Sequence, residues 1–112
     1  MDYKTAYQFL STQSSLSDRR SFLALLQQGQ PPIPGQVTNI LLTLKVTFQH
    51  IEGLDSIDRN LAQILFRLAY DSRQYYDLGK RQGLTWPPLL NEDLERIAQS
   101  VHNIFANQWR DY

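Results

Sequence analysis

His50 and His102 are the two histidines of this 112-residue chain, and histidine titrates nearest to neutral pH of all unperturbed side chains. His50 comes near the end of a predicted helix, where the helix dipole favours a protonated imidazole at the surface. His102 borders an apolar stripe, and a structural role is expected for it. A metal site needs at least three converging ligands, and neither H-E-x-x-H nor H-x-x-x-H occurs. No metal site is therefore predicted.

The carboxylates gather at expected helix starts, with Glu92, Asp93 and Glu95 in one group and Asp55 and Asp58 in another. Acidic side chains are common there because they face the positive end of the helix dipole. An acid–base pair would need two carboxyl groups across a cleft in unlike environments. The chain also lacks the phosphate-binding loops G-x-x-x-x-G-K-[ST] and G-x-G-x-x-G, and the hydrolase elbow G-x-S-x-G. We expect no catalytic residue and no cofactor.

Residues 69–81 mix tyrosines with basic side chains and lead into Trp86. Tyrosine, tryptophan and arginine are enriched at binding hot spots. The same side chains also cover the end of a small core, and Arg73 is one helical turn from Asp77. Packing and partner binding both stay open for this segment. The predicted partner-binding surface consists of Tyr70, Arg73, Tyr75, Tyr76, Lys80, Arg81 and Trp86.

Two proline-rich segments, residues 31–35 and 86–90, interrupt the chain. Proline fixes its own φ and has no N–H to donate, so each segment ends one helix and can start the next. Pro31, Pro32 and Pro34 also form a P-x-x-P pattern of the kind that polyproline-binding domains recognise. We interpret these prolines as a rigid interhelical linker.

After each proline segment, apolar side chains recur at steps of three and four residues, which places them on one face of a helix. The last stripe contains Leu94, Ile97, Ala98, Val101, Ile104 and Phe105. We predict helices over residues 2–13 with Asp2 as cap, between Ser17 and Gly29, from Gly35 to Gly53, from a cap at Asp55 or Ser56 to Gly79 or Gly83, and from a cap at Asn91 onward. The fold class is all-α. A compact bundle of four to five helices with two proline-rich interhelical loops is expected, in one domain spanning residues 1–112.

Composition limits the partners. Eleven basic and eleven acidic side chains cancel, whereas nucleic-acid-binding domains usually carry a basic excess. Nucleic acid is therefore not an expected partner unless Arg67, Arg73, Lys80 and Arg81 share one face. There is no cysteine, the first residues lack the order of a secretory signal, and the apolar runs are far short of the ~20 residues that span a bilayer. A cytoplasmic protein without a membrane span is expected.

Four stretches carry a resemblance: MDYKTA (residues 1–6), QPPIPGQVTNILL (30–42), LAYDSRQ (68–74) and WPPLLNEDL (86–94). They resemble a family of small cyanobacterial proteins without an established function, and the resemblance covers most of the chain. Some members bear the name dethiobiotin synthetase, an enzyme class similar to P-loop ATPases. This chain has no phosphate loop, no parallel-sheet pattern and half the length expected of that enzyme. The resemblance implies a cyanobacterial setting and no transferable active site.

Two functions remain open. The first is a non-enzymatic protein–protein interaction module with a regulatory, adaptor or assembly role, docking a partner through the predicted surface. A homodimer is expected alongside it, because the short helix of residues 3–10 has a broad apolar side. The alternative is a small-molecule or cofactor-binding bundle with possible enzymatic activity, its pocket lined by Tyr70, Trp86 and His102.

Overall fold

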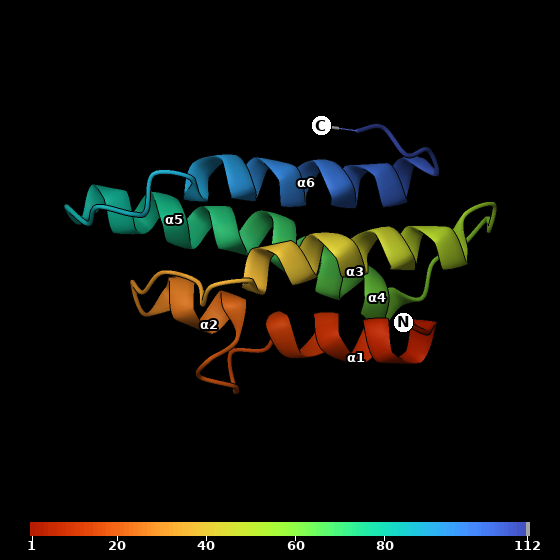
Figure 1. Cartoon of the computed structure of the whole chain (residues 1–112), viewed down its shortest axis with the longest axis horizontal. Helices are drawn as coiled ribbons and strands as arrows, with labels where there is room; N and C mark the ends of the chain where they lie inside the picture. Colours follow the sequence, from red (N-terminus) through yellow and green to blue (C-terminus); the bar gives the residue numbers. More distant parts are fainter. Residues whose placement is uncertain (112) are drawn as a thin grey trace.

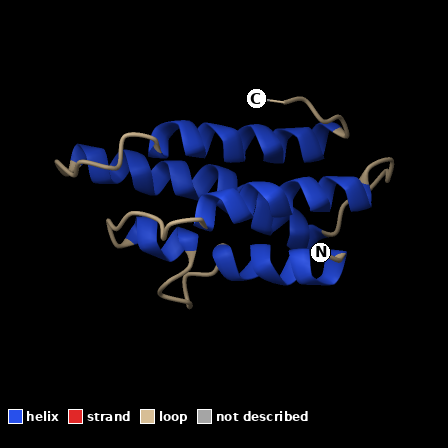
Figure 2. Ribbon diagram, in the orientation of Figure 1, coloured by secondary structure: helices blue, strands red, loops and turns tan. Residues whose placement is uncertain are grey.

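The computed structural model describes residues 1–111, and every regular element in that range is helical (Figure 2). The helices α4, η1 and α5 follow one another without a break and form one long helix. The predicted all-α bundle of four to five helices is confirmed. The elements are α1 (Tyr3–Gln13), α2 (Phe22–Gln27), α3 (Gln36–Ile51), α4 (Arg59–Phe66), the π-helical turn η1 (Arg67–Asp71), α5 (Ser72–Arg81) and α6 (Leu90–Ala106).

The long helix α3 runs through the middle of the molecule (Figure 1). It packs against α1 on one side and α6 on the other. Along the helix of residues 59–81, α4 contacts α1, η1 contacts α6, and α5 contacts α2. The molecule measures 43 × 27 × 23 Å along its principal axes. No described helix has both the length and the apolar character needed to cross a lipid bilayer.

Side-chain caps start several helices, and one of them is as predicted. The Asp2 carboxylate accepts from the Thr5 amide at 2.7 Å and begins α1. The cap predicted at Ser17 is wrong: Ser21 caps α2 by accepting from the Ala24 amide at 3.0 Å. Gln13 accounts for the later start, because its side-chain oxygen accepts from the amide of Phe22 and fixes that residue as the first of α2.

Two further caps differ from the prediction. Asp58, rather than Asp55 or Ser56, caps α4, and its carboxylate accepts from the Leu61 amide at 3.1 Å. The last helix begins at Leu90, so Asn91 lies inside its first turn and does not cap it. The Asn91 side chain instead accepts a hydrogen bond from the long helix, as described below.

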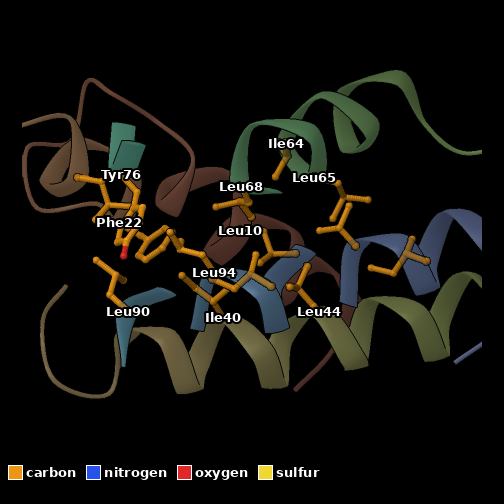
Figure 3. Packing of buried hydrophobic residues seen from close by; sticks show 14 of the residues in the cluster. Leu10, Phe22, Ile40, Leu44, Ile64, Leu65, Leu68, Tyr76, Leu90 and Leu94 are labelled. Carbon is orange, nitrogen blue, oxygen red and sulfur yellow. The ribbon is translucent and has the colours of Figure 1, made fainter. Parts of the chain in front are cut away.

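The core runs the length of the bundle and collects aliphatic side chains from all the helices (Figure 3). Leu10, Ile40, Leu44 and Leu68 meet near its centre. The apolar stripe predicted for α6 includes two residues that the structure leaves exposed. Leu94, Ile97, Val101 and Ile104 are buried, whereas Ala98 and Phe105 are exposed. The buried face of α6 extends instead to Ser100 and Asn103.

Candidate functional site

Tyr76 and Trp86 belong to the core and not to an exposed binding surface. Trp86 is only 7% exposed, its ring centroid lies 5.8 Å from that of Tyr76, and its indole N–H donates to the Tyr76 carbonyl at 2.9 Å. The residues after the long helix thus turn the indole inward. The prediction that Tyr76 and Trp86 belong to an exposed binding surface is therefore wrong, because both side chains are buried.

The neighbouring cations are held by intramolecular contacts. The Arg73 guanidinium lies 5.1 Å from the Tyr76 ring centroid and the Lys80 ammonium 5.7 Å from it. Arg73 also donates to the Asn91 side chain at 2.6 Å, which connects α5 to the start of α6. Arg67 in turn pairs with Asp71 at 3.7 Å.

The other members of the predicted surface lie apart. Tyr70 stacks on Phe66 at a centroid distance of 4.9 Å on the solvent side of the long helix. Tyr75 is half-buried beside α2, where it lines a small recess of about 130 Å³, and Arg81 is exposed in the last turn of α5. The seven predicted residues therefore occupy several places and not one surface.

The two proline-rich segments, 53 positions apart at Pro34 and Pro87, meet in space and enclose a groove of about 310 Å³. We call it the proline groove. Its walls come from the loops that precede α3 and α6 and from the first two turns of those helices. The lining residues are Pro32, Ile33, Pro34, Gly35, Val37, Thr38, Leu41, Pro87, Leu89, Leu90, Asp93 and Arg96.

A buried glutamine holds one wall of the proline groove. Gln36 accepts from the amide of Ile33 at 3.1 Å and donates to the Gln13 side chain at 2.9 Å and to the Arg20 carbonyl at 3.1 Å. A buried polar group with all these partners keeps a rigid position. Gly35, which precedes it, has a φ of 84°, a left-handed conformation that glycine adopts without strain. The loop before α3 is therefore pinned to α1 and to the segment before α2.

Most side chains that line the proline groove are apolar, and Asp93 and Arg96 add charge to it. Leu89 is 63% exposed, although it is a large aliphatic side chain. At the edge, Arg96 pairs with Asp93 at 3.1 Å and with Glu92 at 3.8 Å. Glu95 lies on the same side, so three carboxylates stand against one guanidinium. The groove suits aliphatic side chains on a segment that carries basic residues at its end.

Sequence reasoning missed the residues of the proline groove, although both proline motifs had been singled out. Leu89, Val37 and Arg96 are ordinary helix or loop residues in the sequence, and Gln36 gives no local sign of burial. The usable signal was that each proline run stands directly before a helix with a long apolar stripe. Nothing local indicated that the two helix starts lie side by side.

A second pocket, of about 410 Å³, opens between α1 and α4. The Tyr7 hydroxyl at its edge donates to the Asp58 carboxylate at 3.1 Å. Desolvation of the phenol, with the hydrogen bond and the charge of Asp58, raises the pKa of Tyr7 above its usual range. The lining is mostly polar and comprises Tyr7, Ser11, Ser14, Ser15, Asn60, Gln63, Ile64 and Arg67.

The histidines take part in neither cavity. His50 is exposed, as expected, and stacks on Tyr3 with ring centroids 4.1 Å apart and planes at 8°. His102 is exposed on α6. The pocket predicted from Tyr70, Trp86 and His102 does not form, because Trp86 is buried and the other two point to solvent. Within residues 1–111, no three potential ligands among histidine, cysteine and carboxylate side chains gather around a metal position.

Comparisons of the chain with protein-family models, with curated proteins and with solved structures found no match. The geometry described above is therefore the basis for assigning a function.

Proposed function

We propose that this protein is a non-enzymatic protein–protein interaction module that binds a short segment of a partner protein in the proline groove. One observation supports the proposal above all: two rigid proline segments and two helix starts form one concave surface, lined mostly by apolar side chains, with Leu89 exposed in it. Prolines present such a surface at low entropic cost, because their conformation is already restricted in the free chain.

The charges at the groove edge favour a partner segment of defined character. Its centre carries aliphatic side chains that fit between Val37, Leu41 and Leu89. Its end carries lysine or arginine, which are attracted by the excess of carboxylate over guanidinium around Arg96. A regulatory, adaptor or assembly role fits this mode of binding. The proposed setting is the cytoplasm of a cyanobacterial cell, in line with the resemblance of the proline motifs.

The test begins with affinity purification from the source cell and identification of the protein that co-elutes. The purified partner is then titrated against wild type, Leu89→Ser and Leu54→Ser. Leu54 is the matched control, since it is similarly exposed but lies outside the groove. We expect Leu89→Ser to weaken binding by roughly tenfold or more, as at a hot spot, and Leu54→Ser to leave it unchanged. Equal affinity of all three proteins would refute the assignment of the groove.

A small-molecule-binding bundle is the second candidate, supported by the polar pocket between α1 and α4. Its hydroxyl and amide groups and Arg67 are suited to a small polar ligand. A thermal-shift panel of metabolites, nucleotides and metal ions tests it. Stabilisation that disappears in Gln63→Ala supports this function, and a panel without any stabilisation counts against it.

A further inference from the structure

The long helix of residues 59–81 exposes a stacked aromatic pair. Phe66 and Tyr70 are 53% and 51% exposed, and their rings lie 4.9 Å apart at an interplanar angle of 19°. Aromatic rings bury more apolar area than most side chains when they are covered. A contiguous aromatic patch that stays in water is therefore typical of an interaction surface.

The exposed pair belongs to a row that follows the whole helix. The exposed positions recur every three or four residues, and the steps on either side of Tyr70 are four residues each, which fits the wider turn of η1. The row shares no residue with the proline groove. Its members are Arg59, Gln63, Phe66, Tyr70, Gln74, Leu78 and Arg81, and we call it the aromatic row.

Charges flank the aromatic pair in a self-complementary pattern. Arg59 lies nine positions before the midpoint of Phe66 and Tyr70, and Asp77 lies nine positions after it. Neither makes an ion pair with another of residues 1–111. When a second copy of the helix lies antiparallel across a two-fold axis through this midpoint, Arg59 faces Asp77 of the partner subunit. The same operation places Phe66 against Tyr70 of the partner subunit.

We propose that the aromatic row is the interface of a two-fold homodimer, in which the helices of residues 59–81 pack antiparallel. Four aromatic rings form its centre and two Arg59–Asp77 pairs lie at its rim, the usual division of apolar core and polar edge. Each subunit contributes one helix, so the contact area is at the small end of specific interfaces and the dimer is a reversible one. The surface differs from the one expected at residues 3–10.

Sedimentation equilibrium of the purified chain over a concentration series tests the interface. We expect a reversible monomer–dimer equilibrium that is lost in the variant carrying both Phe66→Ser and Tyr70→Ser. Leu42→Ser is the matched control, because Leu42 is 59% exposed on α3, outside the row, and should leave the equilibrium unchanged. A wild type that stays monomeric throughout, or a dimer that survives in the double serine variant, would overturn the proposal.

Charge reversal tests the antiparallel arrangement separately. Arg59→Asp or Asp77→Arg alone places like charges opposite each other and should raise the dissociation constant by roughly tenfold. The two changes together restore opposite charges and should restore dimerisation. Circular dichroism shows that each variant is folded before it is compared. A folded double variant no better at dimerising than the single ones would overturn the antiparallel pairing, whatever the proline groove binds.

Discussion

The indole of Trp86 lies against the backbone of Gly79, in the space that a side chain at position 79 would occupy. A Cβ atom on Gly79 would come within 2.7 Å of Cζ2 and 3.0 Å of Nε1 of the indole. The hydrogen bond from Nε1 to the Tyr76 carbonyl keeps the ring in this place. The contact anchors the segment after α5, and with it the wall of the proline groove that Pro87 and Leu89 provide.

Gly79→Ala should therefore destabilise the protein, although alanine favours helix. Overpacking a buried contact costs about 1–3 kcal/mol, against a gain of about 1 kcal/mol in helix propensity. We expect the free energy of unfolding in urea to fall by up to roughly 2 kcal/mol. Gln49→Ala, at an exposed position of α3, is the control and should not lower it. A more stable Gly79→Ala variant would mean that the indole moves aside freely.

Replacing Trp86 and Tyr70 by alanine should have unequal effects on stability. Trp86→Ala removes a buried ring and its hydrogen bond, and we expect a loss of about 3–5 kcal/mol. Tyr70→Ala removes a side chain that is half in water, so a change within about 0.5–1 kcal/mol is expected. Chemical unfolding of both variants measures the difference. Equal losses would show that Tyr70 is a structural residue and not a surface one.

Asp58 connects α1 to α4 and also caps α4. Comparing substitutions of Asp58 and Tyr7 should separate the contributions of these two hydrogen bonds to stability. Asp58→Ala removes the cap on the Leu61 amide and the acceptor for the Tyr7 hydroxyl, and should cost about 1–2 kcal/mol. Tyr7→Phe removes only the second hydrogen bond and should cost about 0.5–1.5 kcal/mol. Thermal unfolding of the two variants tests this order. The reverse order would mean that the link between the helices matters more than the cap.

Stability should fall at alkaline pH because of Tyr3 and Tyr7. Desolvation, together with the charge of Asp58, raises the pKa of Tyr3 above 10.0 in the folded protein, and the same causes with a hydrogen bond raise that of Tyr7. The folded state then holds the phenolic protons more strongly than the unfolded state. The contribution of the two phenols to folding stability is fully present below pH 10.0, and it is lost as the pH rises through their folded-state pKa values.

Melting temperatures measured from neutral pH upward test this dependence. The decline of the melting temperature above the pKa of a free tyrosine should be shallower in Tyr7→Phe than in wild type, because one of the two tyrosines with a raised pKa is gone. Tyr75→Phe is a control, with its hydroxyl outside this pair of tyrosines. A decline of the same steepness in wild type and Tyr7→Phe would exclude Tyr7 as its source.

The helices could be predicted well and their first residues less well. Apolar periodicity located each long helix, because the spacing follows from helix geometry alone. Capping was harder, since several serines and aspartates near each start offer the same local hydrogen bond. Ser21 prevails over Ser17 because Gln13 accepts from the amide of Phe22. Asn91 fails to cap because the chain is already helical at Leu90 and its side-chain oxygen accepts from Arg73.

The candidate site could be predicted only in part. The proline segments were recognised as special, but their meeting in one groove depends on the packing of α3 against α6. The tyrosine-rich stretch was recognised too, yet composition does not say which ring is buried. Trp86 turns inward because Gly79 leaves room for it, whereas Tyr70 stays outside on the row with Phe66.

By itself, the sequence determined an all-helical chain interrupted by two rigid proline segments, since backbone hydrogen bonding and the three- to four-residue apolar repeat act between near neighbours. Only the tertiary structure decided which aromatic residues are covered and that the two proline segments share a groove. Burial depends on surfaces that approach from distant parts of the chain. The free energy gained by burying these surfaces arises when the helices pack together, and no single helix determines it.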